Sequence, residues 1–321
     1  MHGVVLNITT LKNNFYCECR TEQRIYIMLS ILIPTYNYIC TKLVHALWVQ
    51  ATSANMTFEI LVGDDGSTDE QTLRENRKIE QWRNCYFLEH GTNVGRAKIR
   101  NWLAEKSQYQ FLLFIDSDAE VCRPDFLERY IHTAAQYGCV VCGCLENIPR
   151  PESPLYSLRY KYEKNADHIR TLTYRTRHPY AQFSTFNFLI PGKIFKDILF
   201  DIRCEQYGFE DALFGEELKE RGIRIVHIDN PLIHTGIETN DVFLHKTEKA
   251  LNTLVVLGDD AQRFSHIAQM AEKIRKWHLA PCIKVWHRLA QKYERKNLLS
   301  PNPSLLLFNL YKLGYLLMLK K

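Results

Sequence analysis

Short apolar runs alternate with longer amphipathic stretches through most of the chain. Residues 30–34 and 111–115 are almost wholly apolar, and polar residues bound each run. Runs of this length are typical of strands that are buried on both faces of a parallel sheet. Residues 68–81 and 94–106 are longer and mix charged with apolar positions, which favours helices. The order of strand then helix predicts an α/β fold with a mostly parallel sheet flanked by helices.

Turn and capping residues set the limits of other predicted elements. Pro124 opens a helix that stops near Gly138, and Asn93 is placed to cap the helix at residues 94–106. Further helices are predicted at residues 42–52 and 211–221, and further strands at residues 59–63, 86–89, 139–145, 188–191 and 223–228. Beyond residue 245 the pattern is helical to the end of the chain.

The pattern divides the chain into three parts. Residues 1–27 have scattered polar positions and no clear period, so we expect a disordered or non-native extension, with Met28 as the hypothesised native start. Residues 28–245 form the predicted catalytic α/β domain, and residues 246–321 form a helical C-terminal region. A chain of 321 residues suits one large domain with such an appendage.

Composition excludes several classes of protein. The formal net charge of +5 suits an anionic ligand or membrane surface, but no nucleic-acid-binding motif is present and no nucleic-acid partner is expected. The ten cysteines lie mostly in apolar surroundings without a secretory signal, which favours a reduced, cytoplasmic protein. Cys139, Cys142 and Cys144 fit a buried strand better than a metal cluster, because no second cysteine pair completes four ligands.

Acidic side chains follow two of the predicted parallel strands. Asp64 and Asp65 follow one strand, and Asp116 and Asp118 follow another. The carboxyl ends of parallel strands form the edge at which open α/β sheets bind ligands. Carboxylates one residue apart present oxygens to a hard divalent cation, and such a cation neutralises a diphosphate leaving group. The pattern therefore predicts a metal and phosphate site at this edge of the sheet.

Five segments follow one another in a fixed order: residues 30–37, 59–69, 93–101, 116–118 and 208–211. Their sequences are SILIPTYN, EILVGDDGSTD, NVGRAKIRN, DSD and GFED. Together they resemble the signatures of inverting family 2 glycosyltransferases of the GT-A fold, such as bacterial surface-glycan enzymes. The resemblance spans roughly residues 28–240. It implies transfer of a sugar from a nucleoside diphosphate, most often UDP, to an acceptor hydroxyl in the assembly of a polysaccharide.

The resemblance also implies which residues bind the nucleotide sugar. It places Pro34 and Thr35 along the nucleotide base and gives Asp65 a hydrogen bond from that base. Asp116 would contact the ribose, and Arg100, on the helix after the third motif, would face the donor. Four of these residues, Pro34, Thr35, Asp65 and Asp116, lie at the ends of predicted strands, which is the edge at which open α/β sheets bind ligands.

The reaction also needs metal ligands and a general base. By the resemblance, Asp118 would hold a divalent cation, Mn²⁺ or Mg²⁺, and His234 would be a further metal or diphosphate ligand; a hydrogen-bonded structural histidine is the other interpretation of His234. Asp211 is the favoured base and Glu210 the second choice, since an adjacent carboxylate raises the pKa of its neighbour. Two acids at a helix N-terminus are also favoured by the helix dipole alone.

Three segments are candidates for contact with an acceptor or a membrane. Residues 155–180 are polar and aromatic and predict a mobile or acceptor-facing stretch; the expected acceptor is a glycan or a lipid-linked molecule. Residues 273–296 interleave basic side chains with Trp277 and Trp286, and residues 305–319 are strongly apolar. Such helices suit the anionic inner face of the plasma membrane, and a bundle packed on the catalytic domain explains them equally. No apolar run is long enough to predict a membrane span.

Two other functions remain open at this point. A nucleotidyltransferase that makes nucleotide sugars would share the nucleotide and metal sites. It usually needs a glycine-rich basic loop after the first strand, where this chain has Pro34-Thr35-Tyr36-Asn37. A catalytically inactive scaffold that binds nucleotide sugars is the non-enzymatic alternative, although every expected acid is present.

Overall fold

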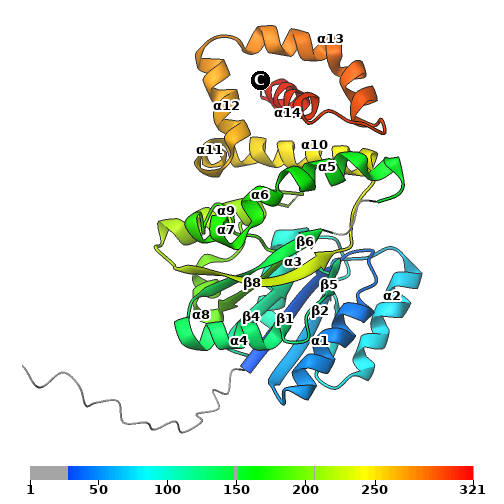
Figure 1. Ribbon diagram of the computed structural model, residues 1–321, viewed down its shortest axis with the longest axis vertical. Helices are drawn as coiled ribbons and strands as arrows, with labels where there is room; N and C mark the ends of the chain where they lie inside the picture. The colour runs from blue at the N-terminus through cyan, green and yellow to red at the C-terminus, as the bar shows by residue number, and fades with distance from the viewer. Residues whose placement is uncertain (1–27, 148–150, 206, 321) are drawn as a thin grey trace, which may run out of the picture.

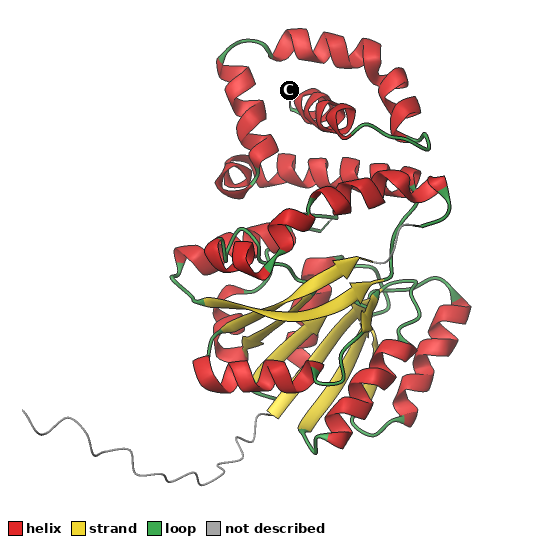
Figure 2. Cartoon of the chain, viewed as in Figure 1, coloured by secondary structure: helices red, strands yellow, loops and turns green. Residues whose placement is uncertain are grey.

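The computed structural model describes residues 28–147, 151–205 and 207–320, and the predictions for residues 1–27 lie outside this part of the chain. Within it, an eight-stranded sheet forms the lower layer of Figure 1, and a set of helices stands above it. The strand order is β3-β2-β1-β4-β7-β6-β8-β5. Figure 2 shows helices packed on both faces of the sheet, so the predicted α/β fold is confirmed.

The first half of the sheet is parallel, as the sequence predicts. Its strands are β1 (Met28–Thr35), β2 (Thr57–Asp64), β3 (Cys85–Glu89) and β4 (Phe111–Ile115). The connecting helices are α1 (Thr41–Ser53), α2 (Glu70–Arg77), η1 (Lys78–Gln81) and α3 (Arg96–Lys106). Ile31 and Ile33 pack with α1, whereas Leu32 packs with α3 on the opposite face. Burial on both faces explains why β1 is an unbroken apolar run.

The second half of the sheet is mixed rather than parallel. Its strands are β7 (Asn187–Pro191), β6 (Val140–Asn147), β8 (Ile225–His234) and β5 (Ala119–Val121). Strand β7 runs antiparallel to β4 and β6, and β5 runs antiparallel to β8. Strand β8 continues past its predicted end at residue 228 and through Pro231, which pairs with Cys144 at an irregularity of β6 where a proline is tolerated.

Three helices connect these strands on the two faces of the sheet. They are α4 (Phe126–Tyr137), α8 (Gly192–Ile198) and α9 (Glu210–Glu220). The predicted end of the first is confirmed, because Gly138 follows α4 in the left-handed conformation with φ of 56°. Helix α9 begins at the acidic pair and lies under the helical layer (Figure 1).

The helical layer is built from the segment before β7 and from the C-terminal part of the chain. Its elements are η2 (Pro154–Tyr156), α5 (Ser157–Asn165), α6 (Asp167–Arg170), α7 (Leu172–Arg177), α10 (Asn240–Leu257), η3 (Gly258–Asp260), α11 (Ala261–Phe264), α12 (His266–Lys276), α13 (Ala280–Leu298) and α14 (Leu305–Leu319). The segment at residues 155–180 is thus largely helical. The predicted division at residues 245 and 246 falls inside α10.

Helix α14 is the apolar segment that the sequence offers as a membrane contact. It lies among α5, α10, α12 and α13, and Phe308, Leu313 and Leu317 are buried there (Figure 1). Helix α14 therefore packs against other helices of the layer, which agrees with the interpretation of this segment as part of a helical bundle. None of the helices described here combines the length and apolarity needed to cross a bilayer.

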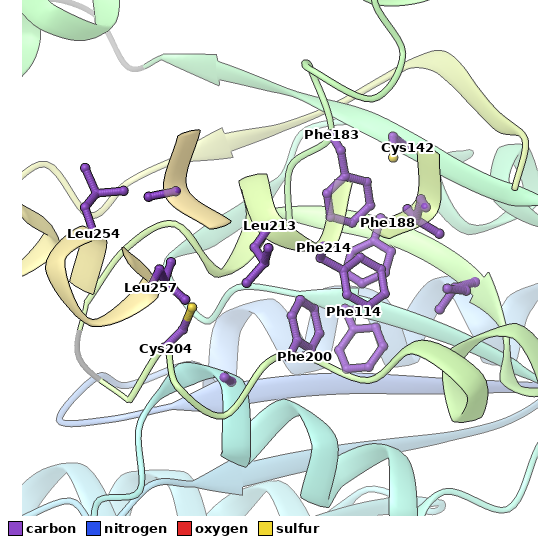
Figure 3. Close-up of a cluster of buried hydrophobic side chains, with 14 of the residues drawn as sticks. Phe114, Cys142, Phe183, Phe188, Phe200, Cys204, Leu213, Phe214, Leu254 and Leu257 are labelled. Atoms are coloured by element: carbon purple, nitrogen blue, oxygen red, sulfur yellow. The ribbon is translucent and has the colours of Figure 1, made fainter. Parts of the chain in front are cut away.

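An aromatic cluster joins the sheet to α9 and the helical layer (Figure 3). Phe114 of β4 stacks on Phe188 of β7 with ring centroids 4.9 Å apart, and Phe200 stacks on Phe214 of α9 at 4.5 Å. Leu254 of α10 belongs to the same buried core. Because these side chains are buried together, the cluster fixes α9 and α10 relative to the edge of the sheet that carries the acidic motifs.

Candidate active site

The carboxyl ends of β1 and β2 lie side by side. Thr35 is in register with Asp64, and the N–H of Asp65 donates to the Thr35 carbonyl oxygen over 2.8 Å. Asp64 is buried and accepts two hydrogen bonds from Ser67, at 2.8 Å from the peptide nitrogen and 2.5 Å from the hydroxyl. Asp64 therefore holds the turn after β2, and Asp65 is the acid of this pair that reaches a cavity.

The carboxylate of Asp65 binds the backbone at the start of α3. Its two oxygens accept the N–H groups of Val94 and Gly95 at 2.7 Å and 3.0 Å. These bonds replace the cap predicted for Asn93, because Gly95 is the N-cap residue and no side chain caps the helix. Gly95 has φ of 87°, and a Cβ there would clash with the carbonyl oxygen of Glu205, so the position needs glycine. Burial raises the pKa of Asp65, and the two N–H groups oppose that change.

A buried arginine joins the two sides of the site. Arg100 is 1% exposed, donates from Nη2 to Asp116 Oδ1 over 2.6 Å, and places Nη1 at 3.3 Å from Glu210 Oε1. Arg96, one turn earlier on α3, lies 3.8 Å from the same Glu210 oxygen and is 42% exposed. The guanidinium of Arg100 is thus shared by two carboxylates, while that of Arg96 remains open to ligands.

Asp118 meets His234 where β8 ends. Nε2 of His234 lies 3.2 Å from Oδ2 of Asp118, and the edge of the Phe186 ring packs against the imidazole at 5.5 Å between centroids. Burial works to raise the pKa of Asp118, but the His234 contact and nearby positive charges outweigh it and lower that pKa. Nδ1 of His234 is buried and has no hydrogen-bond partner among the described residues.

The segment after β8 clamps the backbone of Asp118. The N–H and the hydroxyl of Thr235 donate to the Asp118 carbonyl oxygen at 2.9 Å and 2.8 Å. The Tyr38 hydroxyl lies 3.0 Å from the Thr235 hydroxyl, which ties this segment to the loop after β1. Gly236 comes so close that an added Cβ would lie 2.8 Å from Cβ of Asp118. Position 236 therefore has room for glycine alone.

The acidic pair at the start of α9 divides into a bound and an open carboxylate. Glu210 is 4% exposed and is held by Arg100 and Arg96. Asp211 accepts the N–H of Ala212 at 2.7 Å and has no ion-pair partner within the described part of the chain. Burial, followed by the neighbouring charge of Glu210, raises the pKa of Asp211 to about 6. Asp211 is therefore the carboxylate of this pair that can take up a proton near neutral pH.

The turn that presents Asp211 has a strained backbone. Phe209 has φ of 69°, which is unfavourable for an aromatic residue, and Gly208 before it has φ of 99°. A Cβ on Gly208 would lie 2.7 Å from Cβ of Ala250, so α10 packs directly on this turn. Such a conformation persists only where the surroundings enforce it. Helix α10 therefore holds the turn from which the acidic pair projects.

Two cavities meet along Asp116 and Asp118. The strand-edge cavity has a volume of about 780 Å³, and the helix-side cavity has a volume of about 690 Å³. Predicted site residues lining the strand-edge cavity are Pro34, Thr35, Asp65, Arg100, Asp116 and Asp118. Those lining the helix-side cavity are Asp116, Asp118, Glu210, Asp211 and His234. Apart from Asp64, every residue predicted to belong to the site thus lines one of two adjoining cavities.

Sequence reasoning missed several residues of these walls. Arg96 and Tyr207 line both cavities, and the Arg96 guanidinium lies 4.8 Å from the Tyr207 ring centroid. Arg96 comes directly after the motif Asn93-Val94-Gly95, so its position at this edge was available from the sequence. Arg159 and Lys312 also line the helix-side cavity. No local motif marks them, because tertiary packing alone brings their helices to the site.

The chain matches the family model for glycosyl transferase family 2 over residues 30–199, and it belongs to this family. It is therefore a glycosyltransferase. It is 39% identical over 93 residues to the poly(ribitol-phosphate) beta-N-acetylglucosaminyltransferase TarS of Staphylococcus aureus, which covers 28% of this chain and 16% of that protein. It is 30% identical over 117 residues to the putative teichuronic acid biosynthesis glycosyltransferase TuaG of Bacillus subtilis, covering 35% and 44%. The chain spans less than half of the length of the curated relatives it matches.

Solved structures show the same fold at low sequence identity. The crystal structure of residues 1–349 of TarS from S. aureus superposes with a TM-score of 0.51 at 18% identity, covering 90% of this chain and 89% of that one. The mannosyltransferase PcManGT from Pyrobaculum calidifontis gives 0.52 at 12% identity, covering 90% and 84%. The fold is thus the GT-A fold of glycosyltransferases, as predicted.

The residues at the junction fit a divalent cation in part. Asp118 and His234 offer a carboxylate and an imidazole 3.2 Å apart, and adjacent ligands of one such ion lie about 3 Å from each other. In the described chain, no group of three or more His, Cys, Asp or Glu side chains is arranged to hold a metal. Substrate phosphates or water would have to complete the ligand set, which is common for Mg²⁺ and Mn²⁺. The same finding leaves Cys139, Cys142 and Cys144 without a metal cluster.

Proposed function

We propose that this glycosyltransferase moves a sugar from a nucleoside diphosphate donor, UDP first among the candidates, to a hydroxyl of a glycan or lipid-linked acceptor. The transfer is inverting and metal-assisted, and it serves the assembly of a surface polysaccharide. The observation that carries the proposal is the junction of the two cavities, where Asp118 lines both and His234 and Asp211 line the helix-side cavity. The names of TarS and TuaG support the polymer class.

The strand-edge cavity is the proposed donor site. Pro34, Thr35 and Asp65 line the end of the cavity assigned to the base, and Asp116 lines the part assigned to the ribose. A TarS structure contains UDP-GlcNAc, and the PcManGT structure contains GDP-Man and Mn²⁺, which supports a nucleotide sugar as the ligand. Asp118 and His234 would hold a divalent cation, which would supply positive charge near a departing diphosphate. Arg96, which is exposed and cationic, adds to that charge from α3.

Asp211 is the proposed general base. In a single displacement the acceptor oxygen forms a bond to the anomeric carbon while the bond from that carbon to the diphosphate oxygen breaks. The acceptor proton passes to the carboxylate of Asp211, which is open to the helix-side cavity. Burial and then the neighbouring carboxylate of Glu210, which Arg100 and Arg96 hold in place, raise the pKa of Asp211.

The test is release of nucleoside diphosphate from a panel of nucleotide sugars with Mn²⁺, Mg²⁺ or chelator, in the presence of glycan extract. Release from one donor that chelator abolishes, and that Asp118→Ala reduces by about 100-fold or more, supports the proposal. Release that is equal with chelator and in Asp118→Ala contradicts metal assistance. Formation of a nucleotide sugar from a sugar phosphate and a nucleoside triphosphate would favour the nucleotidyltransferase alternative instead.

We also propose that residues 246–321 form a helical region that brings the catalytic domain, residues 28–245, to an anionic membrane surface. The outer face of α13 carries Val285, Trp286, Leu289 and Tyr293, which are 55%, 42%, 80% and 67% exposed. Their spacing places them on one side of the helix. The single acidic residue of α13 is Glu294, which is buried, so the exposed charges of this helix are basic. An apolar face bordered by lysine and arginine suits an anionic lipid surface.

Sedimentation with lipid vesicles tests this contact. The protein should sediment with phosphatidylglycerol vesicles at low salt, less at high salt, and not with phosphatidylcholine vesicles. Leu289→Glu should reduce that binding strongly, because it puts a negative charge in the centre of the face. Val256→Glu is the matched control, since Val256 of α10 is also exposed (61%) and lies outside α13. Equal sedimentation of both variants and the unaltered protein would contradict the contact.

A further inference from the structure

The helix-side cavity has cationic side chains that the glycosyl-transfer chemistry does not use. Arg159 of α5 places Nη2 at 2.6 Å from Oε1 of Glu163, and Arg170 of α6 contacts the other oxygen of the same carboxylate. Lys312 of α14 also lines this cavity. It differs from the two arginines, because no carboxylate of the described residues lies within ion-pair distance of its ammonium group.

The surroundings of Lys312 are aromatic. Its Nζ lies 4.6 Å from the ring centroid of Phe308 and 5.5 Å from that of Tyr162. Phe243 packs against both rings, with centroids 5.5 Å from Tyr162 and 5.6 Å from Phe308. Burial lowers the pKa of Lys312 to about 8, so the ammonium form still predominates at neutral pH. A partly buried cation without a counter-ion is unfavourable, and a bound anion removes that penalty.

A second side chain that lines the same cavity has an unsatisfied donor. Nη1 of Arg170 is buried and has no hydrogen-bond partner in the described part of the chain, although Nη2 of the same side chain contacts Glu163. Aromatic rings beside free donors are the usual features of a sugar subsite that also binds charge. Asp118 and Asp211 line the same cavity, so a ligand bound beside Lys312 and Arg170 shares it with the proposed reacting groups.

We infer that Lys312 and Arg170 bind an anionic group, a phosphate or a carboxylate, carried by the acceptor away from its reacting hydroxyl. A sugar ring of the acceptor lies on Tyr162, which is 40% exposed, and the reacting hydroxyl reaches Asp211, which lines the same cavity. The inference rests on the proposed function, because the acceptor is defined by that reaction. It narrows the acceptor class from any glycan to an acidic one.

Two variants test the role of Lys312 with a sugar-labelled donor and glycan extract as the acceptor. Lys312→Met keeps the length of the side chain and removes the charge, and it should raise the KM for the acceptor about 10-fold or more. The kcat at saturating acceptor and the slow hydrolysis of the donor alone should stay unchanged. Lys312→Arg should keep most of the affinity. Lys196→Met, on the exposed face of α8, is the matched control and should change nothing.

A second experiment characterises the acceptor and does not depend on any variant. The extract is separated on an anion-exchange resin, and the labelled sugar should enter the retained, acidic fraction. Loss of acceptor activity after carbodiimide amidation identifies a carboxylate, and loss after mild hydrofluoric acid identifies a phosphate. Label in the neutral fraction alone, no loss after either treatment, or an acceptor KM within about twofold for Lys312→Met would each overturn the inference. If the unaltered protein releases no nucleotide from any donor, the proposed function fails instead.

Discussion

The two cavities that meet at Asp118 are built by different means. The strand-edge cavity takes its acids from the ends of neighbouring parallel strands, and internal partners already hold them: Asp65 accepts the start of α3, and Asp116 accepts Arg100. The helix-side cavity takes side chains from distant helices and leaves Asp211 and Lys312 without ion pairs among the described residues. Because the acids of the strand-edge cavity already have internal partners, they give that cavity a fixed shape. In the helix-side cavity, only a ligand or the reaction can neutralise the charges of Asp211 and Lys312.

The largest effect is expected from the helix-side acid. Asp211→Asn should reduce transfer by about 10³-fold or more, because the amide cannot take the acceptor proton, while donor affinity stays within about twofold. Product formation at saturating donor and acceptor and calorimetric donor binding measure the two quantities. If the variant transferred sugar near the original rate, another residue would be the general base. If it lost donor binding in parallel, Asp211 would belong to the donor site, which contradicts the separation of the two cavities.

A large loss of stability is expected from the strand-edge side. Arg100→Met removes one partner of two carboxylates, of which Glu210 is almost fully buried, and it should lower the free energy of unfolding by about 3–5 kcal/mol. Chemical denaturation measures the change. Arg77→Met is the control, because the Arg77–Glu89 pair at 2.8 Å is exposed on both sides, and we expect little change there. If Arg100→Met and Arg77→Met lowered the free energy of unfolding equally, the buried ion pairs of Arg100 would contribute no more to stability than the exposed pair.

An intermediate effect is expected at the junction. Gly236→Ala pushes on Asp118, since the added Cβ would lie 2.8 Å from Cβ of that residue, and we expect about 10-fold weaker activation by Mn²⁺. Titration of activity with the metal measures this. Gly192→Ala is the matched control, because its added Cβ would lie at 3.3 Å from a carbonyl oxygen far from the site. If Mn²⁺ activated Gly236→Ala as well as the unaltered protein, the contact of Gly236 with Asp118 would have no role in metal binding.

The smallest effect concerns pH and again involves Asp211. Its folded pKa is raised from 3.8 to about 6, so between these values the folded chain binds more protons here than the unfolded chain. Stability at this position therefore falls as the pH rises through that window. Asp211→Asn should raise the free energy of unfolding at pH 7.5 and raise it much less at pH 4, because the amide removes a buried charge that is present only at the higher pH. A gain of the same size at both values would mean that the charge of Asp211 is not the cause.

The parallel half of the fold and the predicted site residues could be read from the sequence because the signals are local. Apolar runs mark β1 to β4, and the acidic motifs at Asp65 and at Asp116 and Asp118 directly follow strands. Strand β5, which has only three residues, was not predicted, and the direction of β7 could not be predicted, because an apolar run carries no information on orientation. The pairing of Arg100 with Glu210, 110 residues away, was equally hidden, and so was Lys312, since both depend on how distant elements pack.

The contact of Gly208 with Ala250 has a consequence for protein engineering. The helix that follows the catalytic motifs and begins the C-terminal region is also the support for the strained turn before Asp211. A chimaera that exchanges the C-terminal helices to change the acceptor would therefore disturb the base unless residue 250 stays small and α10 keeps its register. The natural crossover point is therefore after α10, at Gly258, so that the helix and the turn that it supports come from the same parent.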